Sequence, residues 1–141
     1  MLPALYAVLI WWASTVLVLY LDSLPSRTYR WSLLAATALL PVALIVLELA
    51  ARSATPGGAY VAFTAALIVW AWLELTFLTG VLTGPRQEGC PEGCVGWRRF
   101  GYAVQALLWH ELAILAGGVL VLALTWDAPN QVGFWTYAIL W

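Results

Sequence analysis

The hydrophobic and polar positions divide the chain into four long apolar segments separated by short polar ones. The apolar segments cover about residues 4–21, 31–51, 60–83 and 100–126. Each is close to the roughly 20 residues that a helix needs to cross a bilayer core about 30 Å thick. No segment shows the short, period-2 alternation of a transmembrane barrel strand. The pattern therefore predicts an all-α integral membrane protein with four complete transmembrane helices.

The ends of the chain add two further expectations. Residues 132–141 are apolar but too short to cross a membrane, which predicts a partial fifth helix or an interfacial piece. The N-terminus carries no basic residue before its apolar run, so a retained first span is expected in place of a cleaved signal peptide. The predicted architecture is one transmembrane domain, residues 1–141, with four complete helices and a partial fifth.

Composition supports a membrane location. The chain is 64% hydrophobic and only 9% charged, whereas a soluble domain has about 25% charged residues. The six basic residues are all Arg and form no dense basic patch, which excludes a nucleic-acid partner. Membrane lipids are the expected surroundings of the apolar segments.

The arginines predict an orientation. The positive-inside rule places the side richer in Arg in the cytoplasm and thus the N-terminus in the periplasm. Because Cys90 and Cys94 lie on the same cytoplasmic side, they are expected to stay free thiols. This single C-x₃-C pair, with no His in its loop, does not predict a metal site. The Arg-rich side holds five arginines, against Arg52 alone on the other: Arg27, Arg30, Arg86, Arg98 and Arg99.

Three ionisable residues lie inside the third and fourth apolar segments. Glu74 lies ten residues from Gly84, and Glu111 lies eleven residues from Phe100, with His110 beside it. Counted inward from the loop ends at 1.5 Å per residue, both acids lie about 15 Å deep, near the membrane midplane. Ionisable groups at that depth are costly and mark functional sites.

Two tryptophans lie at a similar depth. Trp70 and Glu74 are four residues apart and share a helix face, and Trp109 precedes His110. The sequence therefore predicts a cofactor-binding set made of His110, Glu111, Glu74, Trp70 and Trp109.

The chemistry of this set stays open among four alternatives. His110 could ligate a chlorin or haem, with tryptophans stacked on the ring. The acids and His110 could hold a metal ion, although His110 and Glu111 are adjacent, not spaced as in Glu-x-x-His. They could form a proton relay in a transporter, although no internal repeat is present. Glu74 could instead pair with His110, or share a proton with Glu111, and simply lock the two helices together.

Four stretches resemble a known family: Leu75–Gly80 with Thr83–Arg86, Cys90–Phe100, Trp109–Ile114 and Leu124–Gly133. Through them the chain is similar to the PuhE-like photosynthetic complex assembly proteins of purple bacteria, whose genes accompany that of the reaction-centre H subunit. The resemblance runs the length of the chain, and its most specific parts are the second and fourth stretches.

The resemblance implies an assembly or accessory factor for reaction-centre or light-harvesting complexes in the bacterial inner, photosynthetic membrane. Subunits of those complexes are the implied partners, and bacteriochlorophyll, contacted through His110, is the implied cofactor. The first alternative is a membrane enzyme acting on a hydrophobic pigment or lipid precursor, and the second is a proton-coupled transporter. Members of the family continue with a further span, so the chain is expected to be short at its C-terminus.

Overall fold

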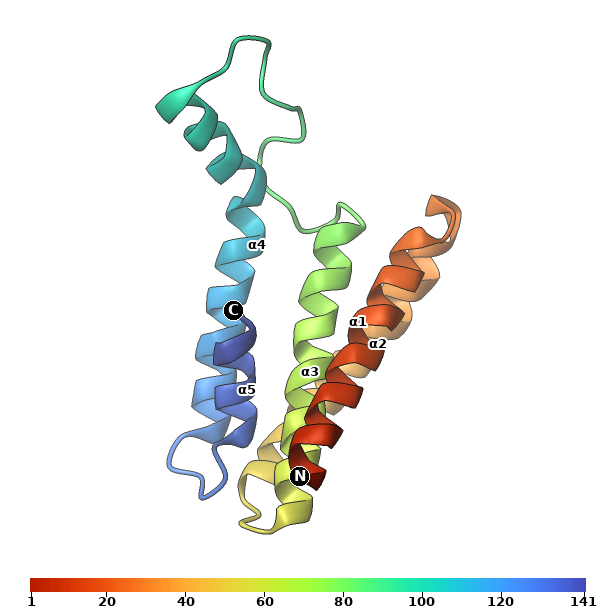
Figure 1. Ribbon diagram of the computed structural model, residues 1–141, viewed down its shortest axis with the longest axis vertical. Coiled ribbons are helices and arrows are strands. Elements are labelled where there is room, and N and C mark those ends of the chain that lie inside the picture. Colours follow the sequence, from red (N-terminus) through yellow and green to blue (C-terminus); the bar gives the residue numbers. More distant parts are fainter.

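The computed structural model describes all residues 1–141 and consists of helices alone. The first four helices are long and apolar enough to cross a membrane, which confirms the predicted all-α membrane fold. The fifth is short, so the expectation of a partial fifth helix also agrees with the structure. The helices, shown in Figure 1, are α1 (Leu2–Ser23), α2 (Ser26–Ala51), α3 (Pro56–Leu78), α4 (Gly96–Thr125) and α5 (Val132–Leu140).

Helix α3 is the centre of the bundle, because the three most extensive helix–helix contacts all involve it and it touches every other helix. Its most extensive contact is with α2. Small side chains let two membrane helices approach closely, where van der Waals packing holds them together. The α2–α3 interface accordingly contains mainly alanines among its buried residues: Ala43, Leu47, Ala50, Ala51, Ala62, Ala65 and Ala66.

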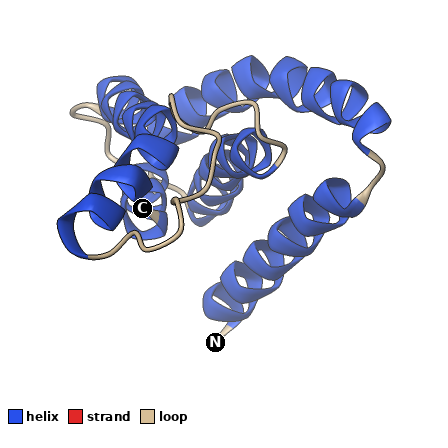
Figure 2. Ribbon diagram, turned by 90° about the horizontal axis from the view of Figure 1, so that it is seen from above, coloured by secondary structure: helices blue, strands red, loops and turns tan.

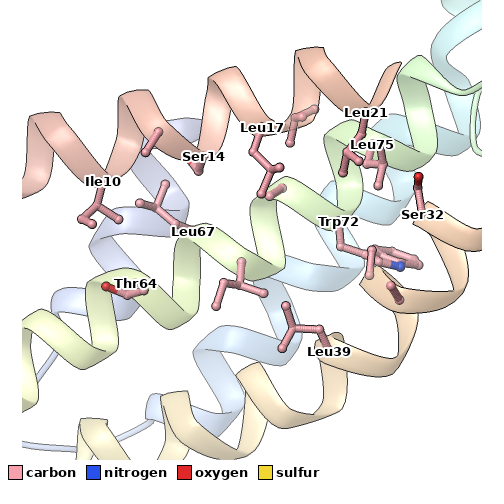
Figure 3. Close-up of a pocket in the computed structure, with 16 residues that line it drawn as sticks. Ile10, Ser14, Leu17, Leu21, Ser32, Leu39, Thr64, Leu67, Trp72 and Leu75 are labelled. Atoms are coloured by element: carbon pink, nitrogen blue, oxygen red, sulfur yellow. The ribbon is translucent and has the colours of Figure 1, made fainter. Parts of the chain in front are cut away.

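Helix α1 is splayed away from α2. The two helices touch only near their connecting turn and diverge from it (Figure 2). Val18 is the one buried residue of α1, and the Tyr6 hydroxyl lies 2.7 Å from the Thr64 hydroxyl of α3. The divergence leaves an apolar cleft of about 460 Å³ between α1, α2 and α3 (Figure 3).

Helix α3 ends five residues earlier than the apolar pattern predicted. The N–H of Gly80 donates to the Phe77 carbonyl, and the N–H of Val81 donates to the Thr76 carbonyl. Gly80 has a φ of 79°. This is the Schellman motif, in which a left-handed glycine satisfies the last carbonyls of a helix. The apolar residues after Gly80 are therefore loop residues and do not extend the span.

Helix α4 is longer than a membrane core is thick. Its 30 residues correspond to about 45 Å, against a core of about 30 Å. The N-terminal third leans away from the rest of the helix, together with the α3–α4 loop (Figure 1). This third carries Arg98 and Arg99, so it suits the membrane surface better than the hydrocarbon core.

Helix α5 packs against α3 and α4 and ends about halfway up the bundle (Figure 1). The Tyr137 hydroxyl donates to the Ile114 carbonyl of α4 at 2.8 Å. Its ring lies over Gly117 and Gly118, and a β-carbon at Gly117 would collide with the ring's hydroxyl end.

The turn before α5 is a hydrogen-bonded clamp. The Asn130 amide donates to the Ala50 carbonyl at the end of α2, and its oxygen accepts from the N–H of Val132. Gln131 donates to the carbonyl of Thr125 at the end of α4. The polar turn of residues 127–131 therefore joins the ends of three helices.

Candidate functional site

His110 lies in a closed junction between α3, α4 and the loop that joins them. Its side chain is only 6% exposed. The imidazole is stacked on the Phe77 ring, with ring centres 4.3 Å apart and planes 25° apart. Its Nδ1 is buried and has no hydrogen-bond partner. The Nδ1 atom of His110 is therefore desolvated and unbonded in a ring that is stacked on Phe77.

The loop segment Thr83–Arg86 closes this junction by lying directly against α4. The N–H of His110 donates to the Thr83 carbonyl at 2.9 Å, and the N–H of Arg86 donates to the Gln105 carbonyl at 3.4 Å. A segment inserted beside a helix ladder is a common cause of a kink, and the contacts fall where the N-terminal third of α4 leans away. Gly84 contacts the backbone of Gln105 and Ala106 so closely that no β-carbon fits there.

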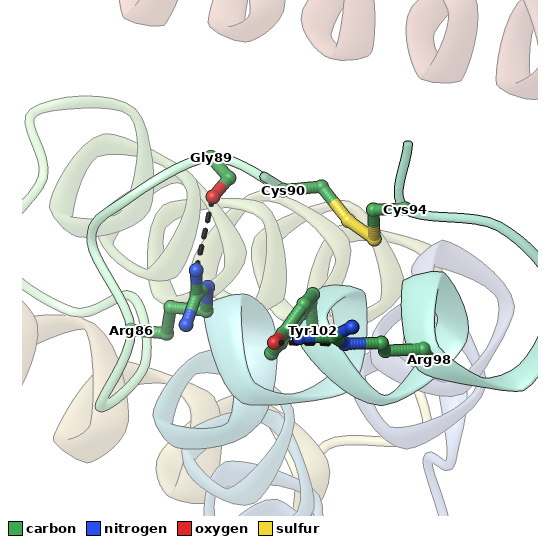
Figure 4. Close-up of a disulfide and its surroundings, with 6 residues drawn as sticks. All are labelled: Arg86, Gly89, Cys90, Cys94, Arg98 and Tyr102. Atoms are coloured by element: carbon green, nitrogen blue, oxygen red, sulfur yellow. Dashed lines mark hydrogen bonds between the residues drawn. A yellow bond between two sulfur atoms is a disulfide. The ribbon is translucent and has the colours of Figure 1, made fainter. Parts of the chain in front are cut away.

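Arg86 fastens the same loop to the leaning third of α4. Its guanidinium lies 4.0 Å from the centre of the Tyr102 ring and donates to the Gly89 carbonyl at 3.0 Å (Figure 4). Arg98 donates to the Tyr102 hydroxyl at 3.2 Å. Tyr102 is therefore held by two arginines, which ties the loop and the helix into one unit.

Trp109 and Glu111 point away from the junction. Successive helix residues are about 100° apart, so burying His110 turns its two neighbours to opposite flanks of α4. Trp109 is 49% exposed, and Glu111 is exposed as well. Glu111 forms no ion pair, because the one ion pair of the chain joins Arg52 and Glu48.

Glu74 lies in a different environment. It lines a cleft of about 440 Å³ formed by α1, α3 and the end of α5, with Trp11 and Trp70 among the other lining residues. Trp70 also packs edge-on against Tyr137, with ring centres 5.7 Å apart. Glu74 is half-buried and, like Glu111, is unpaired within the chain.

The helix ends differ from the ends of the apolar runs, which changes the positions of the two acids along their helices. Glu74 lies only four residues, or about 6 Å, from the end of α3 at Leu78. Glu111 lies about 21 Å from the opposite end of α4 at Thr125. Glu74 is thus nearer to the loop-side end of its helix than the apolar run suggested, whereas Glu111 lies in the middle of α4.

The structure does not bring the predicted residues together in one site. No group of three or more His, Cys, Asp or Glu side chains is placed to hold a metal ion. No ion pair joins Glu74 to His110. The five residues instead fall into three places: Glu74 and Trp70 line the α1–α3–α5 cleft, His110 lies in the junction, and Trp109 and Glu111 face outward from α4.

The prediction of two free thiols is also wrong. Cys90 and Cys94 form a disulfide, with Cα atoms 6.0 Å apart (Figure 4). The reason is a tight turn between them, in which the N–H of Cys94 donates to the Pro91 carbonyl and Gly93 has a φ of 76°. This turn brings the two Cα atoms within the usual range for a disulfide.

The His110 junction and the Glu74 cleft also contain residues that the sequence analysis did not predict as site residues. Phe77 and Thr83 enclose His110, and only Gly80, as a helix stop, signalled that the chain turns back there. Trp11, Ser14 and Thr15 of α1 face the Glu74 cleft, and no sequence signal linked α1 to this acid.

Comparison with known proteins places this fold in a family. The family model described as "Protein of unknown function (DUF3623)" matches residues 1–141. The chain belongs to this family. A curated relative from Rhodobacter capsulatus, the "Uncharacterized 30.4 kDa protein in puhA 5'region", is 35% identical over 143 residues. The match covers 99% of the chain but 52% of the relative, so the chain spans about half the length of that protein. No solved structure matches the chain.

The family-like stretches correspond to the joints of the fold. Residues 83–86 form the segment on α4, residues 90–100 form the disulfide loop and the leaning third of α4, and residues 127–131 form the clamp below α5.

Proposed function

We propose that the chain is an accessory membrane factor that helps reaction-centre or light-harvesting complexes assemble in the bacterial inner membrane. Sequence similarity and the fold support the proposal. The relative from Rhodobacter capsulatus is named for its position in the puhA 5' region, and the sequence resembles photosynthetic complex assembly proteins. The fold is a small membrane bundle whose outer faces offer groups for other membrane proteins to bind.

The observation that carries the proposal is the outward orientation of Glu111 on α4. It is exposed and unpaired within the chain, on a helix apolar enough to cross a membrane. A carboxyl group facing hydrocarbon is costly, and such groups normally face a bundle interior or a partner. A partner helix with a hydrogen-bond donor would remove this cost, and exposed Trp109 and Leu112 would add apolar contact area.

The buried junction gives this docking face its fixed orientation. His110 is enclosed by Phe77 and bonded through its backbone to Thr83, so α4 cannot rotate about its axis without breaking these contacts. Glu111 is consequently presented at a defined angle. In this proposal His110 positions the docking face, and Glu111 binds the partner.

The proposed contact between His110 and bacteriochlorophyll needs a rearrangement. A macrocycle needs an open side of the imidazole, whereas His110 is 6% exposed and stacked on Phe77. We therefore propose pigment binding at His110 only as a state in which Phe77 has left the imidazole. In such a state Trp109 would supply a neighbouring apolar wall.

Co-purification from a phototrophic host in mild detergent tests the docking role. With the wild-type chain we expect reaction-centre or light-harvesting subunits to co-purify, and with Glu111→Leu we expect several-fold less of them. Glu92→Leu, which removes an exposed loop acid, serves as the matched control and should behave as wild type. Equal recovery with Glu111→Leu, or no photosynthetic subunit with the wild-type chain, would overturn the proposal.

The same preparations test the pigment contact. An absorption spectrum of the purified chain with a stoichiometric bacteriochlorophyll band, lost in His110→Leu, would support ligation by His110. A full pigment complement in His110→Leu would exclude His110 as the ligand and leave the positioning role alone.

A further inference from the structure

The cleft that contains Glu74 has the make-up of a small-molecule site. Its volume of about 440 Å³ lies within the usual range of ligand pockets, and nine of its twelve lining residues are hydrophobic. Trp11 and Trp70 supply aromatic walls from two different helices. A few polar groups in an otherwise apolar cleft are what fixes the orientation of a bound ligand.

The two hydroxyl groups that line this cleft from α1 have already used their hydrogen atoms. The Ser14 hydroxyl donates to the Trp11 carbonyl at 2.8 Å, and the Thr15 hydroxyl donates to the same carbonyl at 3.0 Å. Their oxygens therefore offer only acceptor capacity to the cleft. Glu74 adds two further acceptor oxygens when it is ionised.

The acceptors are not satisfied by the chain itself. Glu74 has no ion pair within the chain, and the other lining residues of the cleft contribute no cationic side chain. A carboxylate surrounded by apolar groups gains most from a charged or neutral donor. Glu74 therefore favours a ligand that donates a hydrogen bond over a ligand with an anionic head group.

The position of Glu74 fixes the direction in which such a molecule would lie. Glu74 is about one turn from the loop-side end of α3, close to the membrane surface, whereas Trp70 lies one turn deeper. A ligand with its head group at Glu74 and its apolar body beside Trp70 would have the same orientation as a lipid in the surrounding leaflet. The ligand could enter sideways from the membrane without turning over.

We propose that the Glu74 cleft binds a lipid-soluble molecule that carries a hydrogen-bond donor, a hydroxyl or a protonated amine, on an apolar body. This inference does not depend on the proposed assembly role, because it involves neither Glu111 nor the α4 docking face.

Fluorine NMR of the detergent-solubilised chain, labelled with 5-fluorotryptophan, tests the proposal. Trp11→Phe and Trp70→Phe assign the two cleft resonances. The probes are dodecylamine, 1-dodecanol and dodecanoate, which share one chain length and differ in head group. We expect saturable shifts of both resonances with the amine and the alcohol, and none with dodecanoate at neutral pH.

Variants at Glu74 distinguish recognition of the ligand's head group from binding of its hydrocarbon tail. Glu74→Gln keeps the side-chain volume but removes the charge, so we expect amine affinity to fall about tenfold, with a smaller loss for the alcohol. Glu74→Leu should abolish saturable binding of both. Glu48→Gln is the matched control, since Glu48 pairs with Arg52 outside the cleft; it should leave every shift unchanged.

Three results would overturn the proposal. Equal shifts with dodecanoate would mean that any hydrocarbon chain enters the cleft. Unchanged binding in Glu74→Leu would remove the carboxyl group from recognition. Absence of any shift at Trp11 and Trp70 would mean that the cleft does not bind a small molecule of this kind. The remaining tryptophan resonances must then be sharp and dispersed, which shows that the protein is folded.

Discussion

The backbone N–H of His110 donates a 2.9 Å hydrogen bond to the carbonyl oxygen of Thr83. These two residues are 27 positions apart, and the bond joins the loop after α3 to the middle of α4. It places Gly84 against the α4 backbone and His110 against Phe77. The leaning third of α4, the loop and the outward direction of Glu111 all depend on this junction.

Gly84→Ala should destabilise this junction. A β-carbon at residue 84 would collide with the backbone of Gln105 and Ala106, and backbone atoms cannot move aside as a flexible side chain can. We expect a loss of about 1–3 kcal/mol, measured as a lower thermal unfolding temperature in detergent. Gly101→Ala is the matched control, because nothing lies near its β-carbon position. Equal stability of the two variants would contradict the close contact at Gly84.

Tyr137→Phe should weaken the attachment of α5 to α4. The substitution keeps the ring over Gly117 but leaves the Ile114 carbonyl without the hydroxyl donor. The expected loss is about 0.5–1.5 kcal/mol, measured by denaturation in mixed micelles. Tyr20→Phe, at a tyrosine that is 59% exposed, should cost nothing measurable. A loss in Tyr20→Phe as large as in Tyr137→Phe would assign the effect to the tyrosine hydroxyl in general.

Asn130→Ala should loosen the clamp that joins α2, α4 and α5. Asn130 is buried and supplies both a donor to Ala50 and an acceptor for Val132. Removing the side chain leaves the Val132 N–H without its acceptor, at about 1–3 kcal/mol, whereas the Ala50 carbonyl keeps its bond from the N–H of Ser53. Hydrogen exchange of the Val132 amide should accelerate strongly, whereas Gln87→Ala in the exposed loop should leave it unchanged. Unaltered exchange in Asn130→Ala would mean that packing alone holds α5.

The disulfide should be dispensable for the bundle. It closes a loop of only five residues, so its entropic contribution is about 2 kcal/mol and is confined to the loop. We expect the double variant Cys90→Ser, Cys94→Ser to keep the helix content and the unfolding temperature of the wild-type chain, both measured by circular dichroism. A collapse of helix content in the double variant would show that the loop directs the packing of α4.

The same cysteines report the orientation of the chain. The arginine count predicts that this loop lies in the cytoplasm, whereas the disulfide of the structure suits an oxidising compartment. In intact spheroplasts we expect a membrane-impermeant maleimide, added together with an impermeant reductant, to label Cys90 and Cys94 only after lysis. Labelling before lysis, following an impermeant reductant, would place the loop in the periplasm and reverse the proposed orientation.

Sequence alone was sufficient for the class of fold. Four apolar runs of about membrane length admit one kind of structure, since backbone groups in hydrocarbon must be bonded within each helix. The short fifth helix followed from the same count. The acids and the histidine stood out because ionisable residues are rare in such runs.

Only the tertiary structure decided where those residues lie. Apolarity measures solvent preference and not helix ends, so the loop residues after Gly80 were read as part of the third span, and Glu74 was placed farther from the end of its helix than it is. Whether two side chains meet depends on helix rotation and on contacts such as Thr83 with His110, which hydrophobic periodicity does not encode. The site predicted as one cluster is therefore a closed junction, an open cleft at Glu74 and an outward face at Glu111.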